Sequence, residues 1–215
     1  MLLPAVLQWP DRRNDVASQY DPSNNEIVYN ANSRPAGTFA KARCRALRRQ
    51  QHGLPMALDF SLLNVMIVDD NPHMRILIRS ILLGFGVKNI HECPDGSEAI
   101  AELHHWPADI VFADWMMEPL DGLDFTRLIR TADDSPNRFV PIIMLTGHTE
   151  RHRIVEARDA GVTEFLAKPV TANGLYARLR SVIENPRQFV QSQSFSGPDR
   201  RRRTEDLDDP DRRKD

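Results

Sequence analysis

The sequence predicts an α/β fold, in which a five-stranded parallel sheet is doubly wound and has helices on both faces. From Leu62 onward, short apolar runs alternate with amphipathic segments, and five such pairs follow one another along the chain. Runs such as IVFA and IIML are apolar at consecutive positions, which is typical of strands that are covered by helices on both faces. Right-handed crossover connections leave few topologies for such an alternation.

The first strand–helix pair sets the plan that the others repeat. Residues 63–68 form an apolar, β-branched run that ends in acids, and a helix is expected to follow it. Pro72 is typical of a first helical turn, and Gly84 and Gly86 are typical of a helix end. The apolar face of this helix consists of Met74, Leu77, Ile78, Ile81, Leu82 and Phe85.

The four remaining pairs follow from the same two patterns, a short apolar run and then a segment with helical periodicity. The expected strands are residues 89–92, 109–113, 140–145 and 163–167. The expected helices are residues 96–105, 123–131, 150–160 and 172–184.

Composition divides the 215-residue chain into three parts, residues 1–56, 57–185 and 186–215. The first part carries 8 basic against 4 acidic residues, the middle 12 against 19, and the last 8 against 7. Apolar residues are scattered singly through 1–56, so we expect a disordered N-terminal extension there; alternatively, the natural start is Met56, which opens the string MALDFSLLNVMIVDD. We expect 186–215 to be a disordered charged tail.

An acidic domain between basic or mixed tails argues against a nucleic-acid-binding core. A basic segment at 38–51 is a candidate for binding phosphate or an acidic membrane surface, although a solvated arm is the simpler interpretation. No stretch approaches the roughly 20 apolar residues that a membrane span needs, and no signal peptide is evident. Cys44 and Cys93 lack the spacing of a disulfide framework or thiolate metal site, so we expect a cytoplasmic protein without redox chemistry.

Polar residues stand where the predicted strands end, which is the edge where ligands bind in open parallel sheets. Three carboxylates at two neighbouring strand ends repel one another unless a cation lies between them, and oxygen ligands of this kind favour Mg²⁺. A lysine and a threonine hydroxyl at further strand ends would complete a site for a phosphoryl group, with a carboxylate as nucleophile. These residues are Asp69, Asp70, Asp114, Thr146 and Lys168.

Simpler interpretations exist for the acids taken singly. Asp69 and Asp70 precede Asn71 and Pro72, so they could merely cap a helix, and Asp114 alone could be a solvated loop acid. The ordered placement of all five residues at successive strand ends favours a common site.

Four motifs in this order resemble the receiver domain of bacterial two-component response regulators, of the stand-alone, chemotaxis-regulator type with a flavodoxin-like fold. They are VDD at 68–70, DWMMEPLDG at 114–122, LTG at 145–147 and FLAKP at 165–169, and the resemblance covers about residues 61–184. It implies a phosphoacceptor switch that catalyses only its own phosphorylation and dephosphorylation. A histidine kinase or phosphotransfer protein would supply the phosphoryl group, and an unknown protein would receive the signal.

The resemblance also implies residue roles. Asp114 would be the phosphoacceptor, and Asp70, Asp114 and the main-chain carbonyl of Met116 would ligate Mg²⁺, with Asp69 orienting a metal-bound water. Lys168 would contact the phosphoryl group. Thr146 would be the switch hydroxyl, and Phe165 takes the place of the switch aromatic without the hydroxyl of a tyrosine.

The chain departs from the family pattern beside the acceptor. The usual proline four residues after the acceptor is Glu118, with Pro119 one place later. Met116 is apolar and cannot position an attacking water, whereas His148, two residues after Thr146, can donate or accept a hydrogen bond. We therefore expect Met116 to slow hydrolysis of the phosphoaspartate, and His148 is the second candidate for modulating that rate.

Three alternatives belong to other functional classes. A degenerate receiver would act as an interaction module without phosphorylation. A phosphatase of the haloacid-dehalogenase type would need a second acid two residues after its nucleophile, where Met116 stands. A nucleic-acid regulator would act through the arginines at 200–203 or the N-terminal arm, although the tail offers no DNA-binding domain and nearby acids oppose phosphate binding. No membrane partner is expected, and a homodimer is left open.

Overall fold

The computed structural model describes residues 18–21, 26–29, 58–147, 151–192 and 195–200. The expected basic helix at 38–51, the start residue Met56 and the arginines at 201–203 lie outside the described residues. Among the helices that the structure describes, none has both the length and the apolar character needed to cross a membrane.

Five parallel strands form the central sheet, as the sequence predicts, in the order β4-β3-β5-β6-β7. In this order, the carboxyl ends of four strands, β3, β5, β6 and β7, lie side by side. Asp114 and Thr146 are the last residues of two of these strands, one residue beyond the predicted ends. The strands are β3 (Asn64–Val68), β4 (Asn89–Cys93), β5 (Ile110–Asp114), β6 (Ile142–Thr146) and β7 (Glu164–Ala167).

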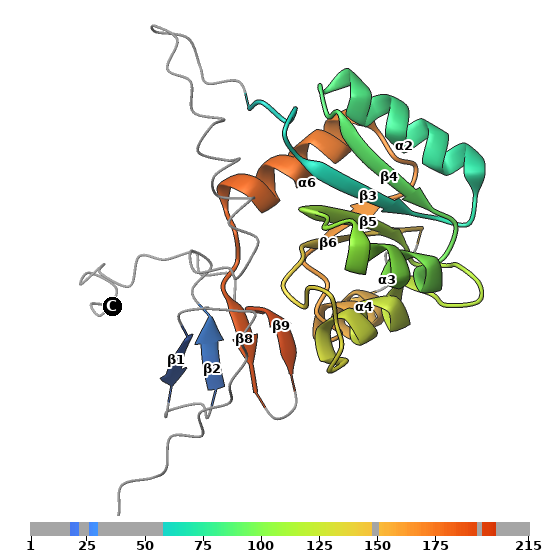
Figure 1. The fold of residues 1–215 in the computed structure, drawn as a ribbon. Coiled ribbons are helices and arrows are strands. Elements are labelled where there is room, and N and C mark those ends of the chain that lie inside the picture. Colours follow the sequence, from blue (N-terminus) through green and yellow to red (C-terminus); the bar gives the residue numbers. More distant parts are fainter. Residues whose placement is uncertain (1–17, 22–25, 30–57, 148–150, 193–194, 201–215) are drawn as a thin grey trace, which may run out of the picture.

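Helices cover both faces of this sheet (Figure 1). On one face, α2 (Pro72–Gly84) and α6 (Ala172–Glu184) pack against side chains such as Val65 and Ile67. On the other face, α3 (Gly96–His105) and α4 (Gly122–Thr131) pack against Met66 and Val68, and α5 (Arg151–Asp159) packs through Ala157 in a group with Met144. Alternate strand residues thus enter opposite cores, which explains the continuous apolar runs.

Side chains before the helices fix where these helices begin. Asn71 accepts a hydrogen bond from the His73 amide, and Asp95, Asp121 and Thr171 accept from amides in the first turns of α3, α4 and α6. The cap of α4 matters most for the site, because Asp121 closes the loop that follows Asp114.

A second, antiparallel sheet lies beside the central α/β fold in the order β1-β2-β8-β9 (Figure 1). It consists of β1 (Ser18–Asp21), β2 (Glu26–Tyr29), β8 (Phe189–Gln191) and β9 (Ser196–Pro198). The prediction of disordered extensions is wrong for these residues. Strands of three or four residues carry no periodic signal, and the backbone of β2 pairs with that of β8, from the opposite end of the chain.

Candidate functional site

Three carboxylates meet at the carboxyl edge of the central sheet. Asp69 and Asp70 follow β3, and Asp114 ends β5, which pairs with β3 in the register Val68 to Ala113. One carboxylate oxygen from each of the three lies within 4.8 Å of the others. The structure therefore brings together the three acids that the strand-end pattern selected.

Asp69 is fully buried and incompletely satisfied. Its Oδ1 accepts a hydrogen bond of 2.9 Å from the Asn71 amide, whereas its Oδ2 is buried with no hydrogen-bond partner. Burial raises the pKa of this carboxyl, and the charge of Asp114 raises it further, against the lowering effects of the Asn71 amide and Lys168. A buried carboxylate oxygen without a donor, beside two other acids, fits a site that holds a hard cation such as Mg²⁺.

Lys168 supplies the positive charge of the site. Its Nζ lies 2.9 Å from Oδ1 of Asp114 and 3.7 Å from Oδ2 of Asp69. The Lys168 amide donates a 2.8 Å hydrogen bond to the carbonyl of Thr146, so the ends of β6 and β7 are tied together where the lysine leaves the sheet. This ammonium therefore offsets part of the negative charge of the clustered carboxylates.

The loop after Asp114 is tightly packed against the backbone of that residue. The Trp115 carbonyl accepts a 3.0 Å hydrogen bond from the Gly122 amide, and a Cβ at Gly122 would lie 2.1 Å from the Asp114 carbonyl oxygen. Trp115 and Met117 are buried, whereas the Met116 side chain between them is 61% exposed. The Glu118–Pro119 peptide bond is cis, at the position where the sequence departs from the family pattern.

The two residues predicted as the switch lie on neighbouring strands. Thr146 is buried at the end of β6, beside β5. Phe165, in β7, is half-buried and packs against a group that includes Trp115 and Leu123. His148 lies outside the described residues.

Sequence reasoning missed one residue that holds the acidic pair in place. The Arg75 guanidinium, from the first turns of α2, donates to the main-chain carbonyl of Asp69 at 2.7 Å and to that of Asp70 at 3.4 Å. It also lies 3.6 Å from Glu92. An arginine on the polar side of a helix gives no sign of this role, because its target is backbone and only the folded loop brings it near.

Cys93 ends β4, on the opposite side of β3 from the acidic site. Its thiol is free and buried, and burial raises the pKa of the thiol to about 12. A thiol with this pKa carries almost no thiolate at neutral pH. Cys44 lies outside the described residues.

Comparison with known proteins agrees with this geometry. The family model described as "Response regulator receiver domain" matches residues 65–180. Among curated proteins, the chemotaxis protein CheY of Pseudomonas aeruginosa is 34% identical over 122 residues, which cover 57% of this chain and 97% of that protein. Chemotaxis protein CheY-3 of Vibrio cholerae is also 34% identical, over 57% of this chain and 92% of its own length.

Solved structures show the same likeness. Chemotaxis protein CheY4 of Vibrio cholerae matches with a TM-score of 0.52 and 29% identity, over 56% of this chain and 98% of that one. The receiver domain of the sensor histidine kinase PA1611 of Pseudomonas aeruginosa, solved with a magnesium ion in its active-site cleft, matches with a TM-score of 0.51 and 29% identity, over 57% and 98%. With the acidic site at the expected edge of the expected sheet, the chain belongs to the response regulator receiver domain family of two-component signalling proteins.

Proposed function

We propose that this protein is a single-receiver response regulator, phosphorylated on Asp114 by a histidine kinase or phosphotransfer protein in a Mg²⁺-dependent reaction. The observation that carries the proposal is the meeting of Asp69, Asp70 and Asp114 within 4.8 Å, with Lys168 at 2.9 Å from the acceptor. Phosphorylation then changes a protein-binding surface that a downstream protein recognises. In this proposal, the phosphoryl transfer to Asp114 takes place in the cytoplasm.

The metal-holding residues follow from the donor set. Asp70, Asp114 and the main-chain carbonyl of Met116 are the ligands in this proposal, and Asp69 acts through a metal-bound water. The exposed Asp70 and the Oδ2 of Asp69, which accepts no hydrogen bond, support a cation between them. When bound, Mg²⁺ supplies charge neutralisation for the phosphoryl oxygens.

In the transfer step, a carboxylate oxygen of Asp114 forms a bond to phosphorus as the bond from phosphorus to the donor's imidazole nitrogen breaks. The electron pair of the broken bond stays on the imidazole. Lys168, now paired with Oδ1 of Asp114, moves its hydrogen bond to a phosphoryl oxygen.

Thr146 and Phe165 act as the switch in this proposal. The new phosphoryl oxygens draw the Thr146 hydroxyl inward, and Phe165 follows into the space that is freed. The burial of Thr146 beside β5 and the partial burial of Phe165 support these roles.

The phosphoacceptor can be tested by the intact mass of the protein after incubation with Mg²⁺ and acetyl phosphate. One phosphoryl adduct is expected on the wild type, and none on Asp114→Asn or in EDTA. Asp134→Asn is the matched control, because it makes the same change at an exposed carboxylate of the α4–β6 loop. No adduct on the wild type, even with early quenching, would favour the degenerate receiver that acts as a phosphorylation-independent interaction module.

Met116 offers a prediction about signal lifetime. With a side chain 61% exposed beside the acceptor, Met116→Asn should place an amide where it can orient an attacking water. The phosphorylated form should then decay roughly tenfold faster, which corresponds to about 1.4 kcal/mol of barrier. The decay of the mass adduct measures this, with Met116→Leu as the apolar control. Equal decay rates in Met116→Asn and the wild type would contradict the idea, and His148 would become the candidate to test.

The nucleic-acid alternative is weakened by one contact. Arg200, the first residue of the arginine run, forms an ion pair of 3.0 Å with Asp159. Its guanidinium also lies 4.1 Å from the centroid of the Phe195 ring. This arginine is therefore engaged within the chain.

A homodimer stays a prediction, which a measurement of the protein's mass in solution would test.

A further inference from the structure

We propose that the C-terminal strap, residues 187–192 and 195–200, is a regulatory element docked on the receiver domain, and that phosphorylation of Asp114 weakens its docking. The strap contains β8 and β9, and it lies against the ends of α4, α5 and β7. This inference rests on the phosphoacceptor role proposed for Asp114.

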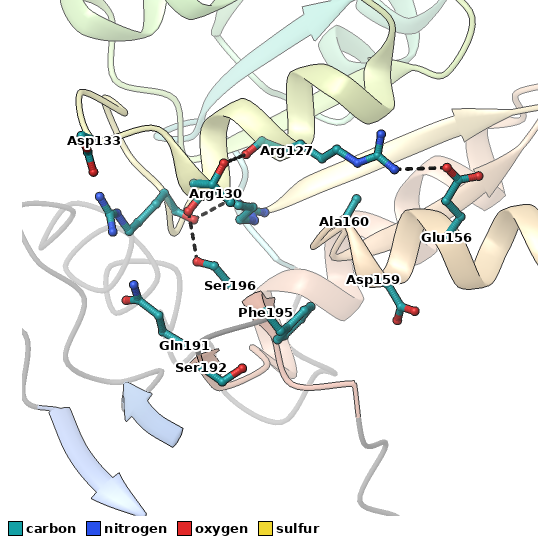
Figure 2. Close-up of a pocket in the computed structure, with 12 residues that line it drawn as sticks. Arg127, Arg130, Asp133, Glu156, Asp159, Ala160, Gln191, Ser192, Phe195 and Ser196 are labelled. Carbon is teal, nitrogen blue, oxygen red and sulfur yellow. Dashed lines mark hydrogen bonds and ion pairs between the residues drawn. The ribbon is translucent and has the colours of Figure 1, made fainter. Parts of the chain in front are cut away.

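Individual polar contacts attach the strap to the receiver domain. The Ser196 hydroxyl donates a 3.0 Å hydrogen bond to the carbonyl of Arg130, near the end of α4 (Figure 2). Arg200 pairs with Asp159 at the end of α5, and Arg187 lies 3.4 Å from Glu164 at the start of β7. The Arg200–Asp159 pair is exposed and contributes little free energy, whereas Glu164 of the other pair is buried.

Ring contacts and two glycines complete the attachment. The Phe189 ring lies edge-on to Phe139, with 4.7 Å between centroids. The backbones of Gly161 and Gly197 approach closely, since a Cβ on Gly197 would lie 2.8 Å from the Gly161 Cα. Gly161 has a φ of +100°, a left-handed conformation that favours glycine. The strap thus fits one particular conformation of the turn between α5 and β7.

A polar cavity lies between the strap and the two helices (Figure 2). Its volume is about 550 Å³, and its lining includes Arg127, Asp133 and Glu156 on the receiver side and Gln191 and Ser192 on the strap. Phe189, Val190 and Phe195 of the strap are buried, so detachment exposes some apolar surface. The strap does not enter the cores on either face of the central sheet, so its detachment is a smaller step than unfolding of the domain.

Both helices under the strap begin beside the proposed acceptor. Gly122 opens α4 against the carbonyl of Asp114, and Arg130 near its other end receives the strap. Only residues 147–150 separate Thr146 from the start of α5, and α5 ends at the Asp159 that Arg200 contacts. A shift of either helix at the acceptor end is therefore carried to the strap.

The second helix is also weakly held by the rest of the domain. Ala157 is its one buried residue. An exposed ion pair of 3.1 Å joins its Glu156 to Arg127 of α4. The contacts of Arg200 with Asp159 and of Gly197 with Gly161 therefore add to what holds the C-terminal end of α5 in place.

The direction of coupling follows from the pairing of Lys168 with Asp114. In this structure the Lys168 ammonium contacts the Asp114 carboxylate directly, a contact that a phosphoryl group on Asp114 would take over, and the strap is docked on α4 and α5. Coupling between two sites is reciprocal. A strap that stabilises this conformation must bind less well after phosphorylation, and weakening the strap must make the acceptor site easier to load.

The first test uses beryllofluoride, a stable mimic of the phosphoryl group, with Mg²⁺ and the full-length protein. Amide hydrogen exchange of peptides covering residues 187–200 should become about fivefold faster at saturating beryllofluoride, at the lower limit typical of coupled sites. Exchange that stays unchanged or slows at saturation would overturn the coupling.

The reciprocal test uses two strap variants. Gly197→Val should displace the strap by steric conflict with Gly161, and Arg200→Gln removes the ion pair with Asp159 and the guanidinium contact with the Phe195 ring. Each variant should bind beryllofluoride more tightly than the wild type, and the affinity should rise about fivefold for Gly197→Val. The titration is followed by the fluorescence of the buried Trp115. Arg180→Gln, which makes the same change on α6, should leave the affinity unaltered.

The outcomes separate the two proposals. If beryllofluoride does not bind the wild type, or binds Asp114→Asn equally, the phosphoacceptor role fails and the coupling fails with it. If beryllofluoride binds at Asp114 but the strap variants retain wild-type affinity, the coupling alone is overturned. If Gly197→Val does not fold, Arg200→Gln and the exchange measurement still decide.

Discussion

Replacing Gly122 with alanine should destabilise the receiver domain by about 3 kcal/mol and abolish phosphorylation of Asp114. The added Cβ would lie 2.1 Å from the Asp114 carbonyl oxygen and 2.9 Å from Sδ of Met144. The first neighbour is backbone, so no side-chain rotation relieves the conflict, and the loop that carries the acceptor must move. Urea unfolding and the acetyl phosphate mass assay measure the two effects.

The matched control for this prediction is Gly84→Ala, at the end of α2. A Cβ on Gly84 would meet no atom within 4 Å, so stability should be unchanged or slightly raised. If Gly122→Ala has the wild-type free energy of unfolding and is fully phosphorylated, the close packing of Gly122 on the loop after Asp114 is unimportant.

Arg130→Met should also destabilise the domain, by about 3 kcal/mol, because it leaves buried carbonyl groups without donors. The Arg130 guanidinium is almost completely buried and donates to the carbonyls of Gly161, Arg138 and Val140 at 2.7 to 3.0 Å. Methionine keeps the apolar stem but supplies none of these hydrogen bonds. The free energy of unfolding in urea measures the loss.

Arg127→Met, one turn earlier on the same helix, provides the control. Arg127 is exposed and pairs with Asp124 and Glu156, so its replacement should cost under about 1 kcal/mol. Equal losses in the two variants would contradict the special role of the buried Arg130.

The strand–helix alternation was predictable mainly because the three inner strands, β3, β5 and β6, are buried on both faces. A run such as residues 110–113 is apolar throughout, and the helix that follows has its own period, so both elements leave a local signal. The site was predictable for a related reason. Parallel strands end at one edge of the sheet, so Asp69, Asp114 and Lys168 converge although they are far apart in the sequence.

Arg130 and the second sheet were not predictable, because both depend on distant backbone. In the sequence Arg130 looks like a surface residue of an amphipathic helix, and its three acceptors are carbonyls from two separate turns. β8 has three residues, and its partner β2 comes from the N-terminal region. Neither segment has enough apolar periodicity to predict a strand alone.

The pairing of β2 with β8 also sets an order for folding during synthesis. Val28 and Val190 are partners although more than 160 residues separate them. At ribosomal rates of about 5–20 residues per second, β2 waits roughly 10–30 s for β8 to be made. All five strands of the central sheet are made before β8, although β7 precedes it only shortly, so the second sheet is the part of the described structure that can be completed last.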